Sequence, residues 1–223
     1  MSKYKVTFAK RGYMIFTSHL DMQRLFKRAF KRAGIALAYS QGFNPHPLMS
    51  FAQPLSLGYY SESEFLEFKT TEDHSPSYIM SRLSDAMPEG LVILDISRMD
   101  DHEKTIASRC TAARYRMEID TKMTETEPAE LMGMIDTFLD QKEIIVLKKS
   151  KKKKEPAETD IKDKIREITP EIVDDKFIMT MLLDAGSTSN LSPELVFQAF
   201  NSFSNSQIPR ECVDITRLQL IYQ

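Results

Sequence analysis

The residues most able to do chemistry lie between Tyr39 and Phe51. This stretch combines aromatic rings, one glycine, several amide and hydroxyl side chains, and His46 between two prolines. The prolines restrict the backbone around His46, so its imidazole could be held in one orientation for binding or proton transfer. Loops of this composition carry function more often than core segments do. The sequence therefore predicts a binding loop with the candidate residues Tyr39, Ser40, Gln41, Gly42, Phe43, Asn44 and His46.

A basic helix is predicted just before this loop. Ser18 followed by Asp21 is typical of a helix start, and Gly34 is typical of a helix end. Between them apolar residues recur every three or four positions, which places the basic residues on the opposite face. That face either contacts an anionic partner or is simply solvated. The candidate binding residues of this helix are Ser18, His19, Asp21, Arg24, Lys27, Arg28 and Lys31.

The charge of the chain is divided unevenly. Residues 1–60 carry nine basic residues and a single acid, a charge of +8, whereas the whole chain carries −2. The remainder is therefore at −10. A cationic front end raises the local concentration of phosphate-rich ligands and equally suits an acidic protein surface.

Several function classes have no motif here. The two cysteines, Cys110 and Cys212, are far apart, and there is no His-Glu-x-x-His or Cys-x-x-Cys pattern, so we expect no metal site. With seven glycines and no phosphate-binding glycine motif, nucleotide enzymes are not favoured. Whether the chain is an enzyme is uncertain, and the sequence leans towards no. His46 and His19 are the candidates for acid–base chemistry.

Composition and periodicity indicate a folded α+β protein. Hydrophobic residues make up 42% of the 223, which excludes collagen-like and disordered chains. The order strand, helix, two strands, helix, strand is read twice, which predicts two tandem ferredoxin-like halves with antiparallel sheets, residues 1–105 and 106–223. The predicted strands are 3–8, 64–69, 91–96, 115–119, 143–147, 176–183 and 214–222.

A lysine-rich insertion interrupts the second half. Residues 148–154 hold six lysines in seven positions, and acidic residues follow, so we expect residues 148–160 to form a charged hairpin loop. The alternative is a contact with phosphate or with an acidic partner. No apolar run approaches the roughly 18 residues that a membrane span needs, and the start does not look like a signal peptide. The sequence therefore predicts a cytoplasmic protein without membrane contact.

Three motifs together resemble a known family. Residues 16–21, the basic helix from Arg24 to Arg32, and the run from Tyr39 to Pro47 are similar to the bacterial radical SAM-linked protein family, a domain of unknown function. The likeness is looser after residue 105. Members stand beside, or are fused to, a B12-binding radical SAM protein, often near genes for ribonuclease and ribosomal proteins. The resemblance implies such a partner, which would carry an iron–sulfur cluster, SAM and B12. This chain has no cluster motif, so no cofactor is expected in it.

Three functions follow as hypotheses. The leading one is a non-catalytic accessory module that presents RNA, or an RNA-associated or ribosome-associated protein, to a radical SAM enzyme through the surface of residues 18–51. The first alternative is a metal-independent RNA-processing enzyme that uses histidine, which rests on fold analogy. The second is a small-molecule-sensing domain, which ligand-dependent thermal stabilisation would reveal.

Overall fold

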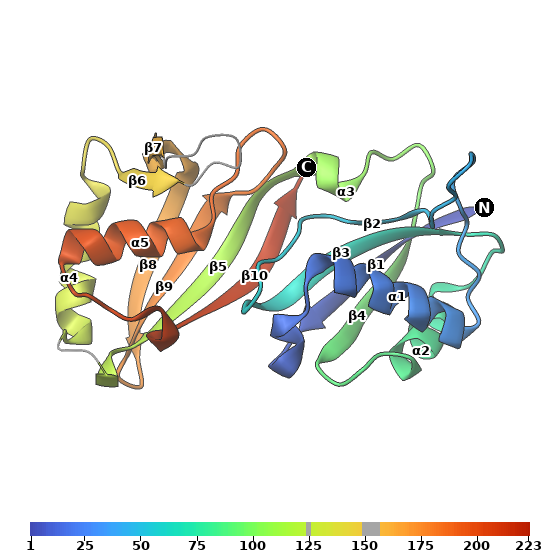
Figure 1. Cartoon of the computed structure of the whole chain (residues 1–223), viewed down its shortest axis with the longest axis horizontal. Coiled ribbons are helices and arrows are strands. Elements are labelled where there is room, and N and C mark those ends of the chain that lie inside the picture. The colour runs from blue at the N-terminus through green and yellow to red at the C-terminus, as the bar shows by residue number, and fades with distance from the viewer. Residues whose placement is uncertain (124–125, 149–156) are drawn as a thin grey trace. The chain divides into compact units, whose positions relative to one another are not determined.

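The computed structural model describes residues 1–123, 126–148 and 157–223 (Figure 1). The chain forms two compact units, one made of residues 1–110 and 217–223, the other of residues 111–216. The described residues form five α-helices and mostly antiparallel sheet, which confirms the predicted α+β class. The ferredoxin-like halves stay a prediction. The predicted halves, residues 1–105 and 106–223, likewise stay a prediction; the first compact unit reaches residue 110 and also includes the last seven residues.

The first unit is an antiparallel sheet with two helices on one face (Figure 1). Its strands follow the order β4-β1-β3, and the short β2 also pairs with β3. The elements are β1 (Ser2–Lys10), a 3-10 helix (Gly12–Phe16), α1 (His19–Ala33), β2 (Met49–Phe51), β3 (Tyr60–Thr70), α2 (Pro76–Asp85), β4 (Leu91–Met99) and α3 (Ile106–Arg109).

Alternation along β1 decides which face of this sheet is the core. Tyr4, Val6 and Phe8 are fully buried against the helices, and Phe26 and Phe30 of α1 pack onto them. Side chains of opposite parity, including Lys3 and Lys5, therefore lie on the other face of the sheet. The apolar stripe of α1 thus packs against the sheet, and the basic residues of the helix face outwards.

Both ends of α1 are set by local sequence. The side chain of Ser18 accepts a hydrogen bond from the backbone N–H of Asp21 at 3.2 Å, as the predicted cap requires. Gly34 ends the helix with a left-handed backbone at φ 71°, which glycine adopts without steric cost.

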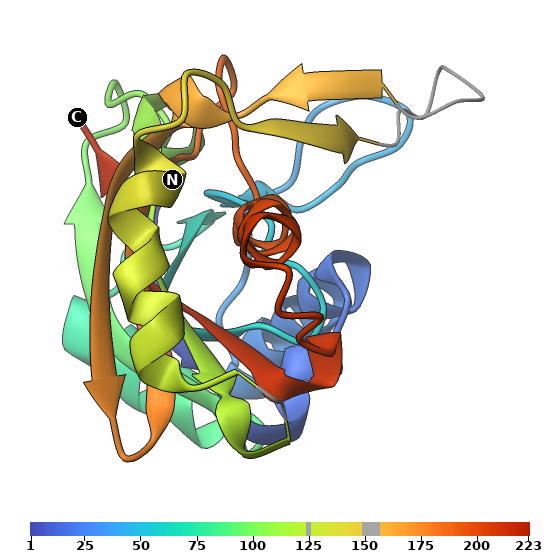
Figure 2. The ribbon, with the colours of Figure 1, turned by 90° about the vertical axis from the view of Figure 1, so that its left-hand side faces the viewer.

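The second unit repeats the theme of a sheet with two helices. Its sheet contains the order β5-β9-β8, all antiparallel, and Figure 2 shows α4 and α5 beside it. Phe138 of α4 and Phe177 of β9 both contact the ring of Phe200 in α5. The elements are β5 (Cys110–Asp120), α4 (Pro128–Leu139), β6 (Ile145–Lys148), β7 (Ala157–Asp160), β8 (Ile165–Val173), β9 (Lys176–Asp184), α5 (Pro193–Ser204) and the start of β10 (Val213–Tyr222), with 3-10 helices at Thr121–Met123, Lys162–Lys164 and Arg210–Cys212. Residues 217–222 of β10 belong to the first unit.

The strand predicted at residues 143–147 does not belong to the main sheet. The apolar run at 143–147 forms β6, which pairs with β7 in a separate two-stranded sheet instead of joining the main one. The main-sheet position belongs to β8, which the sequence pattern does not reveal because Pro170 and several charges interrupt it. In the strand order of this unit β8 pairs with β9 alone, and proline is tolerated on such an edge strand. The lysine-rich residues 149–156 lie outside the described residues.

Candidate functional site

The basic face of α1 forms one wall of a groove. The groove has a volume of about 530 Å³, and Lys27, Arg28 and Lys31 line it together with Tyr39. Phe30 and Leu37 are among its apolar lining residues. We call this feature the α1 groove.

The opposite wall of the α1 groove is held by backbone hydrogen bonds. Ile35 donates to the carbonyl of Phe30 at 3.0 Å, and Ala38 donates to the carbonyl of Lys69 at 2.8 Å. Leu37 forms a bridge with Thr70. The segment after Gly34 therefore runs along β3, and these bonds hold Tyr39 beside the helix.

The three cations of the α1 groove have no acidic neighbour. Among the residues that the structure describes, no carboxylate lies within 4.0 Å of Lys27, Arg28 or Lys31, and all three are exposed. A phosphate or carboxylate of a partner could therefore pair with them without breaking an internal salt bridge.

The other predicted residues of α1 form a cluster at its start. Ser18 donates to Asp21 at 2.7 Å, and Arg24 donates to the same carboxylate at 2.9 Å. These bonds, that of Ser18 first, hold the pKa of Asp21 below its ordinary value. Ser18, Asp21 and Arg24 thus serve the helix start, and they are not among the residues that line the α1 groove.

The predicted loop is closed at its base and open at its tip. Tyr39 bridges Pro47, and the backbone N–H of Ser40 donates to the carbonyl of His46 at 2.9 Å. The Ser40 hydroxyl lies 2.9 Å from Nδ1 of His46 and accepts from the backbone N–H of His46 at 3.1 Å. Between them Gly42 takes a φ of 120°. Phe43 is fully exposed at the tip, next to exposed Gln41 and Asn44.

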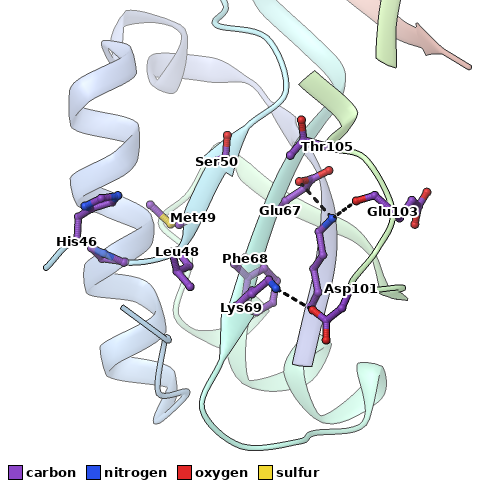
Figure 3. Close-up of a pocket in the computed structure, with 12 residues that line it drawn as sticks. His46, Leu48, Met49, Ser50, Glu67, Phe68, Lys69, Asp101, Glu103 and Thr105 are labelled. Atoms are coloured by element: carbon purple, nitrogen blue, oxygen red, sulfur yellow. Dashed lines mark hydrogen bonds and ion pairs between the residues drawn. The ribbon is translucent and has the colours of Figure 1, made fainter. Parts of the chain in front are cut away.

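His46 also lines a second cavity, which is drawn in Figure 3. This cavity has a volume of about 410 Å³ and lies over β1 and β3, between residues 46–50 and residues 101–105. Charged side chains line it, among them Lys3 of β1, Glu67 and Lys69 of β3, and Asp101 after β4. We call it the sheet cavity.

The two histidines line different cavities. His19 is the first residue of α1, lies edge-on to Phe51 at 5.4 Å, and is 3.1 Å from the amide of Gln23. It lines a small cavity together with Lys10 and Glu64.

Ser40 and His46 have the spacing of a nucleophile and its base, but Ser40 also accepts from the backbone of His46, which is a loop-closing bond. Within the described residues no carboxylate contacts His46, so its imidazole lacks the acidic partner found in serine hydrolase triads. Enzymatic use of these histidines stays a prediction.

The comparisons with known proteins place the chain in a family. The model of a family described as an uncharacterized protein conserved in bacteria (DUF2344) matches residues 3–193. The chain belongs to this family. No curated protein matches it.

Solved structures of low similarity match the whole chain. One, assigned as a glycine cleavage system transcriptional repressor, is 13% identical with a TM-score of 0.24, and the match covers 100% of this chain and 98% of that one. Another, an unknown protein from Galdieria sulphuraria, is 13% identical with a TM-score of 0.27 and coverage of 99% and 98%. At these TM-scores we infer nothing about fold or function from either structure.

This family member also holds a buried charge cluster that sequence reasoning did not find. Arg217 donates to Glu64 through Nε at 2.7 Å and through a second guanidinium nitrogen, while Ser61 donates to the same carboxylate at 2.6 Å. Lys10 lies nearby and donates to two backbone carbonyls. The pKa of Lys10 is lowered, mainly because the ammonium is buried. The charge of Glu64 opposes this shift, and the charge of Arg217 adds to it. The sequence pattern could have predicted that Arg217 is buried. Arg217 comes two residues after the buried Ile215, and alternate residues of a strand point to the same face.

Two further observations concern membrane and metal. No helix in the described part of the chain is long and apolar enough to cross a membrane. Within the same residues, no group of three or more His, Cys, Asp or Glu side chains could hold a metal ion. Cys110 and Cys212 are both buried.

Proposed function

We propose that this protein is a non-catalytic accessory module that binds single-stranded RNA in the α1 groove and presents it to a radical SAM enzyme. The observation that carries the proposal is that three cations without acidic partners line one groove together with the half-exposed ring of Tyr39. Phosphates pair with the cations, and a base stacks on the tyrosine.

Single-stranded RNA suits this groove better than duplex RNA. The partly buried Leu37 gives the groove an apolar part, which accommodates the face of a base but not a phosphate. In a duplex the bases are stacked on one another, so Tyr39 could not reach them. Phe43 at the tip of the loop that Tyr39 begins offers a second ring for stacking.

The enzyme partner is inferred from the family resemblance of residues 16–47. Such a partner would carry the iron–sulfur cluster, SAM and B12, and this chain would supply positioning only. The order β4-β1-β3-β2 of the first unit, with both helices on one face, supports the ferredoxin-like architecture that we propose for each half.

Fluorescence anisotropy with a single-stranded oligoribonucleotide at several salt concentrations tests the proposal. The double variant Lys27→Gln with Lys31→Gln should bind more weakly, and the slope of log K against log salt should fall by about 1.4, or about 0.7 for each phosphate that the variant no longer neutralises. The matched control, Lys122→Gln with Lys142→Gln, removes the same charge from exposed lysines of the second unit and should bind like the unmodified protein. Equally weakened binding in both double variants would mean non-specific attraction and would refute the groove.

Variants of Tyr39 distinguish RNA from an acidic protein as the ligand of the α1 groove. Tyr39→Phe should retain RNA binding, whereas Tyr39→Ala should weaken it by about 1–3 kcal/mol, because a stacked base loses its ring. If the chain instead retains an acidic protein, and RNA binding does not respond to either Tyr39 variant, the RNA proposal fails. Affinity purification from the source cells at two salt concentrations identifies the partner. If no radical SAM enzyme is recovered, the proposed enzyme partner would be contradicted.

A further inference from the structure

The sheet cavity lies on the face of the first sheet opposite the helices. Lys3 of β1 lies across from Lys69 of β3, and Ser50 of β2 lies across from Glu67 of β3, all on this face. Residues 101–106 cover part of the face through three bonds. Lys69 donates to Asp101 at 2.8 Å, Lys3 to the carbonyl of Glu103 at 2.9 Å, and the Ile106 backbone to Glu67 at 2.5 Å.

Two of these charges are buried with hydrogen-bonding capacity unused. Lys3 is 7% exposed and Glu67 6%, yet the Lys3 ammonium and the nearer Glu67 oxygen are 3.9 Å apart, too far for a hydrogen bond. Within the described residues Lys3 makes a single hydrogen bond, although an ammonium has three donors. The Ser50 hydroxyl is exposed and has no side-chain partner among the described residues. A polar ligand could therefore use the remaining donors of Lys3, the second oxygen of Glu67 and the Ser50 hydroxyl.

The charges around the sheet cavity also restrict the ligand. Lys3 and Lys69 are balanced by Glu67 and Asp101, while the carboxylate of Glu103 pairs with Arg109 at 2.7 Å. A ligand with a net charge would leave one group uncompensated. A ligand without net charge preserves the balance, and a zwitterion also offers one charge to Lys3 and the opposite charge to Glu67, which are not hydrogen-bonded to each other. The opposite side of the cavity has an apolar part formed by Leu48 (Figure 3), which has the same strand parity as Ser50.

We propose that the sheet cavity binds a free α-amino acid with an apolar side chain. Its carboxylate would be bound by Lys3 and Ser50, its ammonium by Glu67, and its side chain would pack on Leu48. A cavity of about 410 Å³ falls within the usual range for small-molecule sites. The proposal does not rest on RNA binding, since these residues are not those that line the α1 groove.

Thermal unfolding of the full chain with L-leucine as the probe tests this site. A concentration of about ten times Kd should raise Tm by about 3 °C. N-acetyl-L-leucine lacks the ammonium charge, and L-leucinamide lacks the carboxylate, so neither should raise Tm. No rise with L-leucine up to its solubility limit, or equal rises with all three compounds, would overturn the proposal.

Variants locate the effect. Glu67→Gln should abolish the rise, and Lys5→Met is the matched control, because Lys5 lies across from Glu67 on the same face but does not line the cavity. If Glu67→Gln does not fold, Ser50→Phe fills the cavity from an exposed position and should abolish the rise without altering a charge. A rise that persists in Ser50→Phe would refute the site. Retained stabilisation in the Lys27 and Lys31 double variant would separate this site from RNA binding.

Discussion

Three charged side chains of the first unit are buried close together. Lys10, Glu64 and Arg217 are each at most 5% exposed, and the carboxylate of Glu64 is the negative charge in direct contact with Arg217. A charge pair removed from water is stable only while both partners are present. The stability of this region should therefore depend on Glu64 far more than on any exposed acid of the same strand.

Glu64→Ala should lower the free energy of unfolding by about 3–5 kcal/mol, because it leaves Arg217 and Lys10 buried without that carboxylate. Glu62→Ala is the matched control. Glu62 is exposed on the same strand and pairs with Arg11 at 2.5 Å, so its removal should cost at most about 1 kcal/mol. Urea unfolding of the two variants measures the difference, and similar destabilisation of both would contradict it.

Asp73 predicts a pH dependence. The hydroxyls of Tyr4 and Ser2 each donate to it at 2.9 Å, and Arg98 lies 3.0 Å away. These contacts, Tyr4 first, hold the pKa of Asp73 below its ordinary 3.8. Because the folded pKa is the lower one, ionised Asp73 stabilises the fold above pH 3.8, and this stabilisation is lost as pH falls through the folded value. Urea unfolding should show wild type more stable than Asp73→Asn near pH 7, with the difference shrinking as the pH falls below 3.8. A difference independent of pH would contradict this.

At the scale of elements, α1 combines two tasks. Its apolar stripe packs on β1, and its basic face lines the α1 groove. The position of that face depends on where the helix ends, because Gly34 turns the chain back so that Ile35 to Tyr39 can form the second wall.

Two glycine substitutions should have opposite effects. Gly34→Ala should destabilise the protein by about 1 kcal/mol, because an alanine is strained at φ 71°. Gly133→Ala should stabilise it by about 0.5–1 kcal/mol, because Gly133 is an exposed interior residue of α4 with open space around its Cα. Thermal unfolding followed by circular dichroism measures both. Effects of the same sign would refute this account of the Gly34 turn.

At the scale of the whole molecule, the first unit is discontinuous in sequence. It is made of residues 1–110 and the last seven residues, which bring Arg217 to Glu64 and Tyr222 to Phe65. A fragment of residues 1–110 alone would lack these contacts and keep Glu64 buried without its arginine.

Deleting Arg217–Gln223 should therefore lower the unfolding free energy by about 3 kcal/mol or more. Deletion of Gln223 alone removes one backbone hydrogen bond, to the carbonyl of Arg109, and should have little effect. Denaturant titrations of both truncated chains make the comparison. Equal stability of the two would show that the first unit does not need its C-terminal segment.

The sequence by itself determined the features that depend on near neighbours. The start of α1 at Ser18, its end at Gly34, the separation of its apolar and basic faces, and the strand periodicity of residues 3–8 all follow from contacts within a few positions. Such contacts are encoded in propensity and spacing. The loop candidates Tyr39 and His46 could likewise be named from composition, and both line cavities.

Only the tertiary structure decided which of these residues act together. It put Tyr39 with Lys27 and Lys31, put His46 with Lys3 and Asp101, and kept His19 in a different cavity. It also gave β8, not residues 143–147, the place beside β9. These outcomes depend on pairs far apart in sequence, such as Glu64 with Arg217, whose association is set by sheet register and by the burial of charge. Local periodicity carries no information about either.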